Sequence, residues 1–136
     1  MGIKNLEDIQ LWQLAMQLFE LVVAITDRSP ALRDCKYCDQ IRDASRSVCS
    51  NLAEGYGRYS PAEFSRFITI ALGSLKEVRS LLHEAHLRRF ATDEEVTRGL
   101  DLARRIKSGC ASMKTYLKFA RPPQARRQAR SENQEP

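Results

Sequence analysis

The sequence predicts an all-α fold, an up-down-up-down bundle of four helices, in a chain of 136 residues. Residues that break helices are scarce, with only 6 glycines and 5 prolines. The prolines stand at positions 30, 61, 122, 123 and 136 and leave three long stretches without a break. In those stretches apolar residues recur three and four positions apart, the spacing of one helix face. We therefore predict a bundle over residues 1–120 and a basic, disordered tail over 121–136.

The first predicted helix, which precedes Pro30, is apolar on two sides. In a small bundle only one apolar stripe faces the interior, so the second stripe is a candidate subunit interface. The alternative is a central helix in an uneven, monomeric bundle. The two series are Ile9, Trp12, Met16, Phe19 and Val23, and, offset from them, Leu11, Leu14, Leu18, Leu21 and Ile25.

The other three helices are predicted from their end signals. The second spans about 34–54, and Gly55 is expected to take the left-handed conformation just past its end. Ser60-Pro61-Ala62-Glu63 is the start signal of the third helix, which runs to about Arg89. Thr92-Asp93-Glu94-Glu95 repeats the cap signature at the start of the fourth. Short links between the helices predict antiparallel neighbours.

Positive charge is concentrated near the C-terminal end of the chain. Residues 1–97 hold 12 Lys/Arg and 14 Asp/Glu, whereas residues 98–136 hold 10 and 3, a net charge of +7. A basic segment attracts polyanions, so RNA or DNA is a candidate partner; the alternative is a solvated helix face. The candidate nucleic-acid contacts are Arg104, Lys107, Lys114, Lys118 and Arg121 along the fourth helix, with Arg42 and Arg46 on the second.

The predicted hairpin turn between the second and third helices carries a second group of candidate residues: Asn51, Glu54, Gly55, Tyr56 and Arg58. Glu54 in the last turn of a helix opposes the helix dipole, so we expect an arginine partner, either Arg58 or one from a neighbouring chain. Tyr56 and Arg58 either stack on bases or pack over the helix ends.

The sequence offers no support for catalysis, and we expect no enzyme, cofactor or metal. Nucleophile-elbow, phosphate-loop and dinucleotide-binding motifs are absent from the sequence. Cys35-x-x-Cys38 has the gap of a zinc half-site, with His83 and His86 as a second pair, but the spacing fits poorly; two free thiols are the alternative. No apolar run exceeds five residues, so we expect no membrane span and a cytoplasmic protein.

Three runs of the sequence carry a resemblance to known proteins: Ser47-Val48-Cys49-Ser50-Asn51-Leu52-Ala53-Glu54-Gly55-Tyr56-Gly57-Arg58, Ser60-Pro61-Ala62-Glu63-Phe64 and Ala71-Leu72-Gly73-Ser74-Leu75-Lys76-Glu77. With these runs the chain resembles one bacterial family, the four-helix-bundle proteins encoded by intervening sequences in 23S ribosomal RNA genes. A related branch is the accessory variability determinant of diversity-generating retroelements, which binds nucleic acid.

The resemblance implies a ring-like homopentamer of helical bundles and no catalytic residues. Four residues depart from the family pattern. Cys49 stands where proline is common, Asp43 where a basic residue is frequent, and Arg88-Arg89 where leucine and glycine often close the third helix. The function expected is weak RNA or DNA binding without sequence preference, and the alternative is a scaffold or accessory subunit for a partner protein.

Overall fold

The computed structural model describes residues 9–58 and 60–120. These residues form four α-helices and a short 3-10 helix, with no strand among them. The helices are α1 (Gln10–Thr26), η2 (Ala31–Arg33), α2 (Cys35–Tyr56), α3 (Pro61–Leu87) and α4 (Asp93–Lys118). The predicted all-α, four-helix fold is confirmed, while the predicted tail at 121–136 lies outside the described residues.

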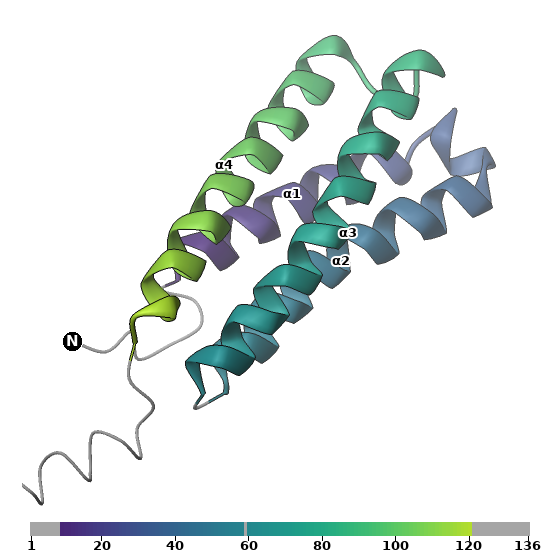
Figure 1. The fold of residues 1–136 in the computed structure, drawn as a ribbon. Coiled ribbons are helices and arrows are strands. Elements are labelled where there is room, and N and C mark those ends of the chain that lie inside the picture. Colours follow the sequence, from purple (N-terminus) through teal and green to yellow (C-terminus); the bar gives the residue numbers. More distant parts are fainter. Residues whose placement is uncertain (1–8, 59, 121–136) are drawn as a thin grey trace, which may run out of the picture.

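The helices form an antiparallel bundle in which each packs on its neighbours in the chain (Figure 1). α1 also packs on α4 and closes the bundle, so α2 and α4 occupy opposite corners. Every helix contributes fully buried side chains to one core, among them Leu18, Ile41, Leu82 and Ile106. A continuous core of aliphatic side chains is the main source of stability in such a bundle.

The two apolar stripes of α1 have different environments. Leu11, Leu14, Leu18 and Ile25 of the offset series are buried inside the bundle, and Leu21 is half-buried. The other series, apart from the buried Ile9, stays partly at the surface. The surface stripe consists of Trp12, Met16, Phe19 and Val23, of which Trp12 and Phe19 also pack partly against the core.

Gly55 serves a different purpose from the one predicted. α2 continues beyond Glu54 to Tyr56, and no glycine among the described residues has a positive φ, so the expected left-handed cap is wrong. A Cβ at Gly55 would lie 2.6 Å from Cδ2 of Phe64 and 2.9 Å from Cβ of Phe67. Gly55 is required because α2 and α3 approach each other closely next to their turn.

Both predicted cap signals form at the helix starts. The Ser60 hydroxyl accepts a hydrogen bond from the Glu63 amide at 3.4 Å, and Pro61 is the first residue of α3. At the start of α4, Thr92 and Glu95 form a reciprocal capping box. The Glu95 amide donates to the Thr92 hydroxyl at 3.1 Å, and the Thr92 amide donates to the Glu95 carboxylate at 2.9 Å. These bonds satisfy amides that the helix itself leaves free.

α3 ends two residues earlier than expected, in a tight turn centred on Arg89. The Arg89 amide donates to His86 O at 3.2 Å, and the Phe90 amide donates to Ala85 O at 2.8 Å. This is a Schellman motif, and Arg89 has a φ of 57° in the left-handed region. A residue with a Cβ is strained there, whereas glycine is not. Phe90 is buried, with its ring 4.9 Å from that of Tyr37.

Replacing Arg89 with glycine should stabilise the protein. Removing the Cβ relieves left-handed strain and costs some unfolded-state entropy, for a net gain of about 1 kcal/mol in the free energy of unfolding. Urea denaturation measures the gain. The control is Arg79→Gly on the exposed face of α3, which should lose about 1 kcal/mol; equal losses in both variants would contradict the assignment.

The ion pair between Arg28 and Glu95 should make stability depend on acid pH. Mainly because of the hydrogen bond from Arg28, the pKa of Glu95 falls from 4.5 to about 2. A carboxyl with a depressed folded-state pKa stabilises the protein above its unfolded pKa, and this contribution is lost as the pH falls toward 2. Because Arg28 is 43% exposed, we expect only about 1 kcal/mol.

Chemical denaturation between neutral pH and pH 2 checks this dependence, with Glu95→Gln compared with the neighbouring Glu94→Gln. The Glu95 variant should have a lower free energy of unfolding at neutral pH, and this free energy should fall less steeply as the pH is lowered. Glu94→Gln should keep the pH dependence of the parent. Identical pH profiles for all three proteins would rule the effect out.

Candidate nucleic-acid interface

The predicted cations of α4 that the structure describes lie at the surface, and Lys114 and Lys118 lie on the side of the helix near α3. Lys107 is exposed. Two helical turns later, the half-buried Lys114 donates a hydrogen bond from Nζ to Thr69 Oγ1 of α3 at 2.7 Å. Lys118 is exposed, with Nζ 5.9 Å from the centre of the Phe119 ring. Arg104, also exposed, is held by Asp101 at 2.7 Å. Arg121 lies outside the described residues.

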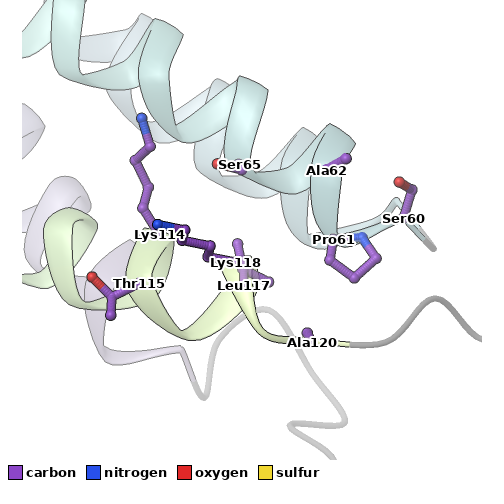
Figure 2. A pocket seen from close by; sticks show the side chains of 9 residues that line it. All are labelled: Ser60, Pro61, Ala62, Ser65, Lys114, Thr115, Leu117, Lys118 and Ala120. Carbon is purple, nitrogen blue, oxygen red and sulfur yellow. The ribbon is translucent and has the colours of Figure 1, made fainter.

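The end of α4 and the start of α3 enclose a pocket of about 600 Å³. Figure 2 shows Lys114 and Lys118 coming from α4, while Pro61 and Ser65 come from α3 and Ser60 is the residue just before it. Ammonium and hydroxyl groups from two helices thus border one hollow. Both kinds of group donate hydrogen bonds to anions such as a phosphate.

Within residues 9–58 and 60–120, the lysines differ from several arginines in forming no ion pair. Among the described residues, every side-chain ion pair is formed by an arginine or by His86, and none by a lysine. Lys107, Lys114 and Lys118 therefore have no carboxylate partner in this part of the chain. Uncompensated cations at a surface attract anions more strongly than paired ones.

A second pocket, of about 430 Å³, lies between α1 and α4 and adds a cation that sequence reasoning missed. Its lining combines apolar residues such as Leu11 and Leu14 with Arg104 and Arg105. Arg105 was overlooked because it falls outside the stripe defined by three- and four-residue spacing. Arg105 lies seven residues after the exposed Arg98, and residues seven apart share one face of a helix. This spacing is the signal in the sequence for a second group of cations on α4.

Arg42 and Arg46 lie at the opposite corner of the bundle from α4. Arg42 donates to Thr26 Oγ1 at 2.7 Å and to Asp27 at 2.8 Å, and so holds the end of α1. The guanidinium carbon of Arg46 lies 6.0 Å from the centre of the Phe19 ring. The structure thus does not bring these arginines together with the α4 stripe, and their contacts join α1 to α2.

The hairpin residues make contacts within the chain. Asn51 donates to Ser47 O at 2.8 Å, and the Ser47 hydroxyl lies 2.7 Å from that of Ser74 on α3. Arg58 pairs with Glu54 at 2.7 Å, which confirms the predicted partner.

Arg58 also lies with its guanidinium carbon 5.4 Å from the centre of the Phe67 ring, and Tyr56 packs half-buried against the core. The packing alternative therefore describes both side chains better than a free stacking surface. The hairpin motif holds α2 to α3.

The residues weighed above for a zinc site do not lie in one cluster. No group of three or more His, Cys, Asp or Glu side chains suited to a metal occurs in the parts of the chain that the structure describes. His86 Nε2 lies 3.1 Å from Asp93, Cys35 is exposed and Cys38 is buried. None of the described helices is long and apolar enough to cross a membrane.

Comparison with known proteins places this fold in a family. A family model described as 23S rRNA-intervening sequence protein matches residues 7–112, most of the bundle and the whole hairpin motif. A search of curated proteins found no match. Because the family model covers well over half of the 136 residues, the chain belongs to the family of 23S rRNA-intervening sequence proteins.

Proposed function

We propose that the protein is a non-enzymatic, homopentameric helical bundle that binds RNA or DNA through phosphate groups, without sequence preference. The observation that carries this proposal is the row of uncompensated lysines on α4, which ends at the pocket shared with α3 (Figure 2). Lysines contacting phosphates supply affinity and carry no direct sequence information.

The charge of α4 supports the proposal because it changes sign along the helix. The first turn carries Asp93, Glu94 and Glu95. From Arg98 onward, the described residues hold six cations and one acid, Asp101, a net charge of +5. The basic end is the end that borders the pocket, and Arg121, Arg126, Arg127 and Arg130 continue the basic sequence after it. Five copies of a chain with net charge +5 carry +25.

The surface stripe of α1 supports assembly. Trp12, Phe19 and Val23 are half-buried, and Met16 is 37% exposed. These four side chains lie on one face of the helix, as the 3.6-residue period requires. A contiguous apolar stripe of this kind marks a protein contact, and a second copy of the chain is the partner proposed here.

The second candidate function is a scaffold or accessory subunit whose ligand is another protein. Leu87, at the end of α3, favours it because this leucine is 82% exposed. A pull-down from nuclease-treated lysate discriminates the two: a defined protein partner recovered without nucleic acid supports the scaffold, and loss of all bound material supports nucleic-acid binding.

Neutralising the α4 lysines should weaken nucleic-acid binding and its salt dependence. The triple variant Lys107→Gln, Lys114→Gln, Lys118→Gln should reduce the slope of log K against log salt by about 2 to 3, because each phosphate contact contributes about 0.7 to 0.9. Fluorescence anisotropy with labelled single-stranded RNA over a salt series measures the slope.

A matched triple variant, Lys36→Gln, Lys76→Gln, Arg79→Gln, removes the same charge from exposed positions on α2 and α3. It should leave most of the slope in place. If both triple variants bind equally, α4 is not the interface, and if parent binding ignores salt, the electrostatic proposal fails.

A charge in the surface stripe of α1 should disrupt the assembly. Met16→Lys should convert pentamers into monomers of 15.5 kDa, because the burial of a lysine at an apolar contact is unfavourable. Gln17→Lys, one residue along and exposed, is the control and should leave the pentamer intact. Sedimentation velocity at micromolar concentration measures the oligomeric state of both variants. A parent protein that sediments as a monomer would refute the assembly.

A further inference from the structure

The first turn of α2 carries two cysteines that the proposed function does not use. Cys35 is the first residue of the helix and Cys38 follows one turn later. All four cysteines lie within the described residues, and only Cys35 is exposed. Cys38 has 5% of its surface accessible. An accessible thiol next to a shielded one, in a Cys-x-x-Cys sequence at a helix start, is an arrangement suited to thiol–disulfide exchange.

We propose that Cys35 and Cys38 form a thiol–disulfide exchange site that low-molecular-weight disulfides oxidise reversibly. Three residues along an α-helix separate two Cα atoms by about 5 Å, from the rise and radius of the helix. Disulfides span Cα separations of roughly 4.4 to 6.8 Å. Helical side chains lean toward the preceding turn, which directs Cys38 toward Cys35.

The Cys38 thiol makes only weak hydrogen bonds to its surroundings. Its Sγ lies 3.1 Å from Ala31 O and 3.8 Å from Thr26 O, so the thiol donates to the backbone before α2. Sulfur is a weak donor, and a change of χ1 releases it. Burial raises the pKa of the Cys38 thiol, so Cys35 is the more accessible of the two thiols for the first exchange.

The carboxylate that precedes Cys35 in the chain is already engaged by other partners. Asp34 accepts from the Tyr37 amide at 3.0 Å and pairs with Arg88 at 2.7 Å. These two partners lower the pKa of Asp34, and they offset its charge next to Cys35. Helix starts stabilise thiolates, which are the nucleophiles of the exchange.

The reaction takes place in two exchanges. The Cys35 thiolate attacks one sulfur of the small disulfide, a new S–S bond forms, and one small thiolate leaves and takes a proton from water. Cys38 then loses its proton to solvent and attacks Cys35 Sγ, which expels the second small thiolate. The two cysteines lose two electrons and two protons, and one disulfide becomes two thiols.

Cys49 and Cys110 provide an internal contrast. Both are buried, and burial raises the pKa of each thiol to about 11. Such thiols stay protonated and inaccessible at neutral pH. Oxidation should therefore be selective for the pair on α2.

The test incubates the full-length protein with excess oxidised glutathione, blocks free thiols with an alkylating agent, and maps the peptides after trypsin digestion. Because trypsin cuts after Lys36, a Cys35–Cys38 disulfide holds together two fragments that separate on reduction. We expect this linked pair as the main product, reversed by reduced glutathione, with Cys49 and Cys110 alkylated only after unfolding.

Two variants define the roles. Cys38→Ser should stop at a glutathione adduct on Cys35, and Cys35→Ser should leave Cys38 unmodified. A parent protein that stays reduced, or that accumulates the Cys35 adduct without closing the disulfide, overturns the proposal. The parent result stands even if a variant fails to fold, and it is independent of nucleic-acid binding because α2 lies diagonally across from α4.

Discussion

The close approach of α2 and α3 at Gly55 is the constraint on which the rest of the structure depends. Because Gly55 has only a hydrogen in place of a side chain, the Phe64 ring and the Phe67 Cβ of α3 pack directly against α2. This contact fixes where α3 begins, and the Ser60 cap fixes its first turn. The start of α3 in turn forms one wall of the pocket whose other wall is the end of α4 (Figure 2).

The sequence was sufficient to predict the helices and most of their ends, because those depend on local chemistry. Periodic apolar residues, the caps at Ser60 and Thr92, and the pairing of Glu54 with Arg58 are all encoded within a few positions. The steric role of Gly55 could not be predicted in this way, because Phe64 and Phe67 contact it only after the chain has reversed direction. Local patterns cannot distinguish a glycine needed for its φ from one needed for space.

Local sequence patterns have the same limit at the candidate site, where they predict the position of a cation along its helix but not its partners. The spacing of lysines along α4 predicted one cationic stripe, which the helix then displays on its surface. Spacing could not show that Arg42 would bind the end of α1, 15 and 16 residues away, or that Arg46 would lie over Phe19. Whether a cation is compensated depends on long-range partners: among the described residues, Arg42 has a carboxylate partner in Asp27, while the lysines of α4 have none.

The reversal of charge along α4 has a consequence for how large charged molecules approach. Acids at the first turn of α4 and Lys118 at its last turn interact favourably with the helix macrodipole. The same charges give α4 one acidic end and one basic end. A long polyanion that comes near this helix is repelled by the first and attracted by the second, which favours one orientation of the polyanion before any contact forms.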